Sequence, residues 1–163
     1  MNIKIKNHLL LYRDYKLNCS IGKSGITNKK KEGDLATPKG NFKIGMLYYR
    51  KDRIKNFKCK IKKKIIKRNM GWCDDIRSNQ YNREIIFPFK YKAEKLYRRD
   101  KIYDIFIEIK YNHCPIIKGK GSVIFLHLCN KKYKPTKGCI AIQKKDFLKI
   151  LPLINNATKI SIR

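Results

Sequence analysis

Acidic residues are scarce in this sequence. Its 163 residues include 12 Asp and Glu against 41 Lys and Arg, which gives a formal net charge of +29. Such an excess excludes an acidic surface and predicts attraction to anionic polymers that weakens as salt rises. The cations are spread along the chain, so a generally basic surface is the simplest interpretation. The densest run, Lys51 to Arg68, has little of the aromatic interleaving of single-strand binders, and no specific nucleic-acid partner is expected.

Long apolar runs are missing as well. The apolar run Leu9 to Tyr12 ends at Arg13, far short of the hydrophobic core of an export signal. No stretch approaches the roughly 20 residues that a membrane-spanning helix needs. We therefore expect neither a signal peptide nor a transmembrane segment in this sequence.

The cysteines lack the spacing of a metal or redox motif. None of the six belongs to a C-x-x-C pair, so a zinc ribbon or a thioredoxin-type site is unsupported. His127, Cys129 and Cys139 could in principle bind a metal, but the sequence suggests no fourth ligand. We expect no metal and no cofactor.

The length and the apolar periodicity predict one mainly β domain, residues 1–163. Alternating apolar residues predict strands in 1–21, after Gly40, in Tyr103 to Tyr111 and in 159–163. The odd-numbered residues from Tyr103 to Tyr111 are expected to share one face of a half-buried sheet. One short helix is predicted for Lys144 to Leu151, with Pro152 ending it.

The segment from Gly121 to Ile142 brings chemistry-bearing residues together. Alternation in Val123 to Leu128 places His127 on the face opposite to the leucines, and alternation in Cys139 to Ile142 sets Cys139 opposite to the isoleucines. If the leucines and isoleucines share a core, the thiol and the imidazole share the other surface. The loop between the two segments contains the turn formers Asn130, Pro135, Thr136 and Gly138.

A thiol beside an imidazole can perform acyl transfer. The imidazole takes the thiol proton, and the resulting thiolate attacks an acyl carbon. The N–H groups of Gly138 and Cys139 could donate to the oxyanion that forms. In the structural alternative, Cys139 is packed as a small apolar residue and a backbone carbonyl satisfies His127.

The sequence resembles a known family at these residues. GSVIFLHL followed by PTKGCIAI is similar to the catalytic signature of the L,D-transpeptidase (YkuD-type) domain, in its shorter Pro-Thr-x-Gly-Cys branch. The resemblance implies a mainly β, sandwich- or barrel-like fold with mixed sheets and a short C-terminal helix. Similar segments occur in the family's order at Lys31 to Asp34, Thr37 to Phe42, Trp72 to Asp75, Tyr81-Asn82, Glu94, Arg98 to Asp100 and Tyr103-Asp104.

The resemblance also implies roles for individual residues. Cys139 would be the nucleophile, His127 the general base, and Gly138 with Cys139 the oxyanion donors. Lys137 stands where many members have a second histidine, and Ala141 where many have a polar residue. The candidate substrate-binding residues are Thr136, Phe125, Trp72, Asp74, Tyr81 and Ser122.

Five further side chains have structural interpretations. Trp72 either walls the groove or belongs to the core. Of Asp74 and Asp75, one is expected to cap a turn and the other to pair with a basic residue such as Arg98 or Arg99. Asp34 and Thr37 are expected to hold the backbone of the loop from Gly22 to Gly40.

The activity that the resemblance implies is L,D-transpeptidation in a bacterial cell wall. The acyl donor would be a peptidoglycan stem peptide, and an amine of a second stem would resolve the Cys139 thioester, in the periplasm or cell envelope. Two alternatives remain: water as acceptor, which gives a carboxypeptidase or amidase, or a non-catalytic basic protein that binds polyanions. The sequence leaves the oligomeric state open.

Overall fold

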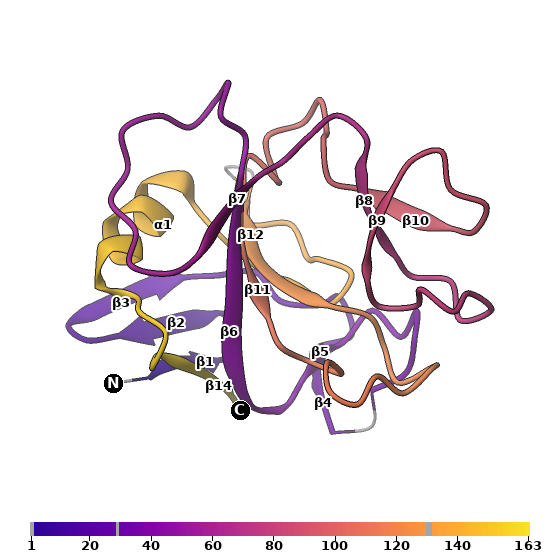
Figure 1. Cartoon of the computed structure of the whole chain (residues 1–163). Helices are drawn as coiled ribbons and strands as arrows, with labels where there is room; N and C mark the ends of the chain where they lie inside the picture. Colours follow the sequence, from indigo (N-terminus) through magenta and orange to yellow (C-terminus); the bar gives the residue numbers. More distant parts are fainter. Residues whose placement is uncertain (1, 29, 130–131) are drawn as a thin grey trace.

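The structure is a computed structural model that describes residues 2–28, 30–129 and 132–163; the predicted turn former Asn130 lies outside these ranges. Most of its regular structure is β, as predicted, and Figure 1 shows the elements. The strands are β1 (Ile3–Lys6), β2 (Leu9–Tyr12), β3 (Tyr15–Asn18), β4 (Ile26–Thr27), β5 (Thr37–Pro38), β6 (Gly40–Tyr49), β7 (Lys63–Ile65), β8 (Met70–Cys73), β9 (Glu84–Ile86), β10 (Ala93–Lys95), β11 (Ile105–Ile109), β12 (Ile124–Leu128), β13 (Ile140–Ile142) and β14 (Lys159–Ile162). The helices are α1 (Lys144–Ile150) and the 3-10 helix η1 (Leu151–Leu153).

The long strand β6 organises the main sheet. The strand order is β13-β12-β11-β6-β14-β1-β2-β3, and β7 also pairs with β6. The first residues of β6 pair with β14, and the later residues pair with β11 on its other edge. The sheet is mixed because β1 pairs with β14, β6 with β7, and β12 with β13 in parallel, whereas the remaining pairs are antiparallel.

The two ends of this sheet approach each other. Ser20, which follows β3, forms an antiparallel bridge with Ala141 in β13, and the two residues exchange backbone hydrogen bonds of 2.8 and 3.0 Å. Because β3 and β13 are the outer strands, this bridge gives the sheet a nearly closed, barrel-like form. The predicted sandwich- or barrel-like, mainly β fold is therefore confirmed.

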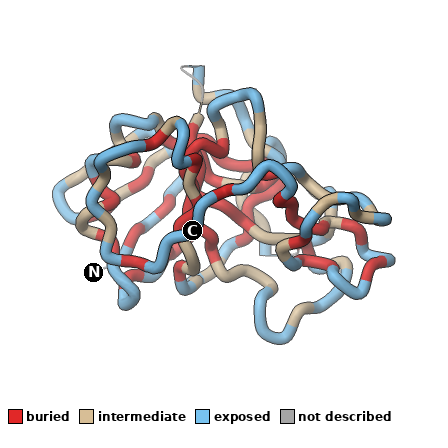
Figure 2. The backbone as a smooth tube through the Cα atoms, turned by 45° about the horizontal axis from the view of Figure 1, so that its top comes forward, coloured by how far each residue is buried: buried red, intermediate tan, exposed pale blue. Residues whose placement is uncertain are grey.

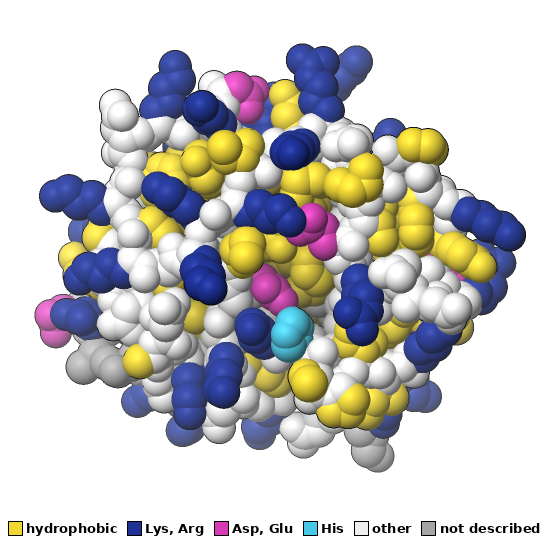
Figure 3. All heavy atoms as spheres, in the orientation of Figure 1, with side chains coloured by type: hydrophobic (Ala, Val, Ile, Leu, Met, Phe, Trp, Pro, Cys, Tyr) yellow, Lys and Arg dark blue, Asp and Glu magenta, His cyan; other side chains and the backbone are white. Residues whose placement is uncertain are grey.

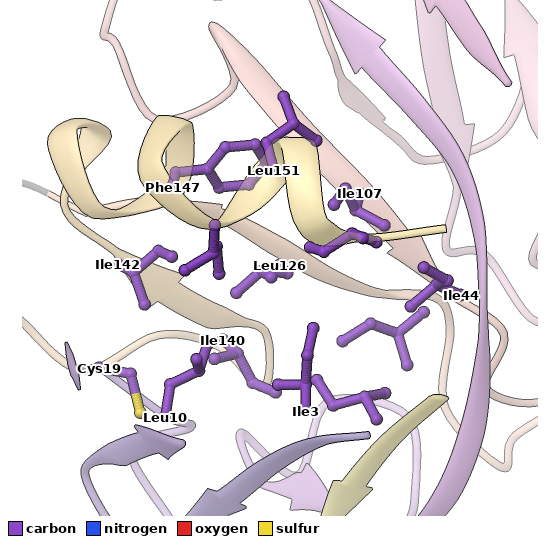
Figure 4. Close-up of a cluster of buried hydrophobic side chains, with 14 of the residues drawn as sticks. Ile3, Leu10, Cys19, Ile44, Ile107, Leu126, Ile140, Ile142, Phe147 and Leu151 are labelled. Carbon is purple, nitrogen blue, oxygen red and sulfur yellow. The ribbon is translucent and has the colours of Figure 1, made fainter. Parts of the chain in front are cut away.

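The larger core lies between the main sheet and α1. Leu126, Ile140 and Ile142 point into it from β12 and β13, and Phe147 and Leu151 cover them from the helix side (Figure 4). Full burial of a side chain such as Phe147 contributes about 2–3 kcal/mol. Figure 2 shows buried backbone running through the interior and exposed backbone in the outer loops.

A second core lies on the other face of the main sheet. It contains Phe106 and Phe125 from the sheet, and Trp72 from the three-stranded sheet β10-β8-β9. The strand β11 is thus buried on both faces, so the prediction of a half-buried strand was wrong. Tyr103 lies in this second core rather than on the face of Ile105, because the chain turns before β11 begins.

The helix prediction was nearly right. The helix α1 has Asp146 in its first turn and Lys149 in its last, which is the favourable arrangement of charges for the helix dipole. It ends at Ile150, and the chain continues as η1 with Pro152 in its first turn.

Cations are scattered over one face of the molecule rather than gathered in a single patch. Figure 3 shows Lys and Arg side chains over the whole of the visible face, with few acidic side chains among them. This distribution agrees with the prediction of a generally basic surface. Within the described residues, no helix combines the length and apolar character that crossing a membrane would require.

Candidate active site

His127 and Cys139 line the same pocket, as the alternation of the two segments predicts. In the parallel pair β12–β13, His127 lies opposite Ala141, and Cys139 directly precedes β13. The pocket has a volume of about 280 Å³. Its wall is formed by Glu94, Arg98, Ile102, Tyr103, His127, Leu128, Cys129, Lys134, Pro135, Thr136, Lys137, Cys139 and Ala141.

A backbone carbonyl orients the imidazole of His127. The Nδ1 atom lies 2.8 Å from the carbonyl oxygen of Leu128, so Nδ1 carries the proton and donates it. This tautomer leaves the lone pair on Nε2 free to accept a proton. The ring also packs edge-to-face against Tyr103, with 5.3 Å between the ring centroids. Burial lowers the pKa of His127 to about 4, so the imidazole is neutral at pH 7.

Cys139 is a thiol in the resting protein. Its Sγ accepts a hydrogen bond from the backbone N–H of Phe125 at 3.3 Å. Burial, with a smaller contribution from the nearby Glu94 carboxylate, raises the pKa of Cys139 to about 12. The thiol and the imidazole are therefore both neutral at rest, and the proton has to leave the sulfur during attack rather than before it.

Thr136 shapes the turn before the nucleophile candidate. Its Oγ1 donates to the carbonyl oxygen of Cys139 at 2.5 Å and accepts from the N–H of Gly138 at 3.1 Å. The Gly138 N–H is thus already hydrogen-bonded in this structure. For Gly138 to act as an oxyanion donor, the Thr136 hydroxyl would have to release it.

Thr37 holds the same turn from the other side. Its buried hydroxyl accepts from the N–H of Gly22 and donates to the carbonyl oxygen of Gly138, both at 2.8 Å. Asp34 accepts hydrogen bonds from the N–H groups of Lys31 and Ala36. The prediction that Thr37 and Asp34 hold loop backbone is confirmed.

The turn at Gly138 lies so close to the loop at Ala36 that position 138 requires glycine. Gly138 has a φ of +132°, a backbone conformation that residues with a Cβ atom rarely adopt. A Cβ atom there would lie 2.8 Å from the backbone oxygen of Ala36.

The opposite wall of the pocket comes from another part of the chain. Glu94 in β10 accepts a hydrogen bond from the Tyr103 hydroxyl. Arg98 Nη1 lies 3.7 Å from Glu94, whereas its Nη2 lies 2.6 Å from Asp100. Sequence reasoning placed these residues in segments similar to the family but assigned them no role in the site. The only signal was their presence in those segments, because no local period links β10 to β12.

The predicted substrate-binding residues are distributed differently from expectation. Of the six, only Thr136 belongs to the wall of the pocket. Phe125 lies beneath Cys139, to which it donates its N–H, and its ring packs against Trp72 with 5.5 Å between centroids. Trp72 is buried and donates its Nε1–H to Asn82, so it belongs to the core rather than to the pocket wall.

Tyr81 and Ser122 both bind Glu32, which lies outside the pocket wall. Their hydroxyl groups donate to the two carboxylate oxygens of Glu32, at 2.6 and 3.3 Å. Tyr81 is buried, and this arrangement ties three loops together. A binding role for Trp72, Tyr81, Asp74 or Ser122 remains a prediction.

One of the two adjacent aspartates caps a turn and the other pairs with a basic residue, as predicted, but that residue is not Arg98 or Arg99. Asp75 accepts from the backbone N–H and the guanidinium of Arg77, so it both caps a turn and forms an ion pair. Asp74 pairs with Lys92 at 3.2 Å. Arg98 is instead bound to Asp100, a nearer carboxylate in sequence.

Metal-binding chemistry finds no support in the part of the chain that the structure describes. Within it, no three His, Cys, Asp or Glu side chains are grouped to hold a metal ion. The cysteines are free thiols, among them Cys129, which shares the pocket with Cys139.

Burial of neutral His127 makes stability depend on pH. The folded protein holds the pKa of His127 at about 4, below its ordinary value of 6.5, so the unfolded chain binds a proton more readily between these values. The free energy of unfolding is therefore expected to fall as pH drops from 6.5 to 4, by about 3 kcal/mol in total. Urea denaturation at pH 7 and pH 4.5 checks this.

The variant His127→Asn is the control for this measurement because its side chain does not titrate. The loss of stability between pH 7 and pH 4.5 is expected to be larger in the wild type than in the variant. Equal losses in the two proteins would show that His127 does not titrate in this window.

A free thiol and a neutral imidazole thus line one pocket, at or next to paired strands. This pair is typical of enzymes that transfer acyl groups through a cysteine. A model of the L,D-transpeptidase catalytic domain (YkuD) matches residues 2–162. The chain therefore belongs to the L,D-transpeptidase catalytic domain family, whose members act on peptidoglycan stem peptides. No curated protein and no solved structure matches it.

Proposed function

We propose that this protein is a cysteine acyltransferase that performs L,D-transpeptidation on peptidoglycan stem peptides, with Cys139 as nucleophile and His127 as general base, and that residues 1–163 form one catalytic domain. One observation supports this most strongly. The pocket contains a free thiol together with an imidazole whose Nδ1 is bound to Leu128, so Nε2 is left to accept a proton.

The first half-reaction forms a thioester. Sγ of Cys139 attacks the carbonyl carbon of the donor peptide while its proton passes to Nε2 of His127. The developing oxyanion would accept from the N–H of Cys139, and from that of Gly138 once Thr136 releases it. The C–N bond then breaks, and His127 returns the proton to the departing amine.

The second half-reaction releases the acyl group. The nitrogen of an acceptor amine attacks the thioester carbon, and His127 takes a proton from it. The C–S bond then breaks as His127 passes this proton to Sγ, which regenerates the Cys139 thiol. Water in place of the amine would give a hydrolase. The cationic groups of Lys134 and Lys137 at the pocket suit substrates that carry carboxylates.

The test is intact-mass spectrometry of the protein after incubation with stem tetrapeptides. We expect one acyl group per chain, located on Cys139 by peptide mapping, and cross-linked product when an amine acceptor is added. A carbapenem should give an adduct on the same thiol. A protein that acquires no mass from any peptide or drug would contradict the proposed function, and hydrolysate without cross-linked product would assign the water-dependent reaction.

A further inference from the structure

The pocket contains one carboxylate that lacks a close cationic partner. The side chain of Glu94 is 41% exposed, and its ion pair with Arg98 is long, at 3.7 Å. The guanidinium of Arg98 is already engaged by Asp100, to which it donates from Nε at 3.0 Å and from Nη2 at 2.6 Å. Asp100 therefore offsets part of the Arg98 charge. Burial raises the pKa of Glu94, and the charges of Arg98 and Lys137 oppose this effect.

Four carboxylates outside the pocket wall have a much closer cationic partner. Asp34, Asp52, Asp75 and Glu84 each have a Lys or Arg nitrogen within 2.7 Å. Among the described residues, Glu94 is the one carboxylate in the wall of the pocket. A cationic ligand group would complete the environment of Glu94.

Glu94 is held in a fixed position relative to the reacting groups. It lies opposite Trp72 in the β10–β8 pair, and Trp72 packs against Phe125, whose N–H binds Cys139. Tyr103 donates to Glu94 and packs its ring against His127. The carboxylate is thus connected by packed side chains to both catalytic candidates.

We propose that Glu94 binds the ammonium group of the acceptor amine and thereby favours amine over water as the group that resolves the thioester. This inference rests on the proposed function and deepens it by assigning the residue that selects the acceptor. A primary ammonium group can donate three hydrogen bonds, and a carboxylate is its natural partner. The bound ammonium loses one proton to solvent, and its nitrogen attacks the thioester carbon. His127 then takes the second proton from the nitrogen and passes it to Sγ of Cys139 as the C–S bond breaks.

Charge-selective thiol labelling tests the ammonium site without any turnover. Two methanethiosulfonate reagents of similar size, one with an ammonium and one with a sulfonate head group, form a disulfide with a cysteine and release methanesulfinate. The ratio of their rates at Cys139, located by peptide mapping, reports the charge of the pocket. The exposed Cys114 in the same molecule reports the effect of the generally basic surface.

We expect the ammonium-to-sulfonate ratio at Cys139 to exceed that at Cys114, and Glu94→Gln to lower the Cys139 ratio about tenfold. The matched control is Glu84→Gln, because Glu84 likewise accepts from a tyrosine hydroxyl and pairs with a cation but lies outside the pocket wall. Tyr103→Phe removes the hydroxyl that holds Glu94 and should give a smaller decrease. An unchanged ratio in Glu94→Gln, or a wild-type ratio at Cys139 no higher than at Cys114, overturns the proposal.

The second measurement is the partition of the thioester between an amine acceptor and water. Glu94→Gln should form the thioester at a rate similar to the wild type. Its ratio of cross-linked product to hydrolysed product should be about tenfold lower. If thioester formation falls as much as cross-linking, Glu94 acts in the first half-reaction and the proposal is wrong. If the wild type forms no thioester, the proposed function fails, and the labelling ratios alone decide whether Glu94 is an ammonium site.

Discussion

Replacement of Cys139 by alanine is expected to abolish thioester formation and to lower turnover by on the order of 10³-fold or more, because the attacking sulfur is removed. The fold should persist. The side chain is small and only partly buried, and the lost contact is one N–H···S hydrogen bond with Phe125, so the expected cost is about 1 kcal/mol of unfolding free energy. Intact-mass detection of the acyl-enzyme, steady-state turnover and thermal melting together check this result.

Cys129 provides a matched control for this variant. It is also a free thiol, it lines the same pocket and it lies two residues from His127, but it has no part in the proposed mechanism. Cys129→Ala is therefore expected to retain turnover within a fewfold of the wild type. If Cys139→Ala retained activity and Cys129→Ala abolished it, the assignment of Cys139 as the nucleophile would be wrong. If both variants kept full activity, cysteine chemistry as a whole would be refuted.

Replacement of His127 by asparagine is expected to lower the rate of acylation by about 10²- to 10⁴-fold, the usual contribution of a general base. The amide nitrogen of asparagine can take the place of Nδ1 and donate to the Leu128 carbonyl, so the local structure should be preserved. What is lost is Nε2, the atom that receives the thiol proton. Because the pKa of Cys139 is raised to about 12, almost no thiolate exists at pH 7 to compensate for the missing base.

Single-turnover acylation across a range of pH values separates this explanation from a structural one. In the wild type the rate should stay high down to about pH 5 and fall only as His127 becomes protonated near its lowered pKa of about 4. In His127→Asn the rate should rise steadily with pH, following the thiolate fraction of Cys139. A variant with wild-type rates at pH 7 would exclude His127 as the base.

The proposed mechanism starts from a neutral pair rather than from a thiolate–imidazolium pair. Burial disfavours charge on both groups, which explains the opposite directions of their pKa values. Such a pair contains little thiolate until an electrophile lies beside it. Proton transfer coupled to attack then avoids a free charge inside the pocket.

Local periodicity was sufficient for much of the fold. Alternation in β1 sets Ile3 and Ile5 inward and the lysines outward, and the same pattern predicts β12 and β13 on either side of the loop that precedes Cys139. Because side chains alternate across a strand, the shared surface of His127 and Cys139 follows once Leu126 and Ile140 are assigned to the core. The helix at Lys144 was predictable for the same reason, since its apolar residues recur at helical spacing.

The errors have a common cause, which is that alternation describes one strand and not what covers it. The strand β11 looked half-buried because Glu108 and Lys110 alternate with its isoleucines, yet a second sheet covers that face and buries Phe106. Trp72 was assigned to a groove wall or to the core, and only the position of β8 over Phe125 decides for the core.

From the sequence alone came the mainly β class, the family resemblance and the pair of a thiol and an imidazole on one surface, since each depends on residues close together in the chain. Only the tertiary structure decided which carbonyl orients His127, that Thr37 and Thr136 hold the turn at Gly138, and that Glu94, Arg98 and Tyr103 form the facing wall. The contacts of His127 with Leu128 and of Thr136 with Gly138 are local in sequence, but a strand pattern does not specify them. The other features require contacts between segments far apart in sequence, and the free energy of such contacts depends on the packing of the whole sheet.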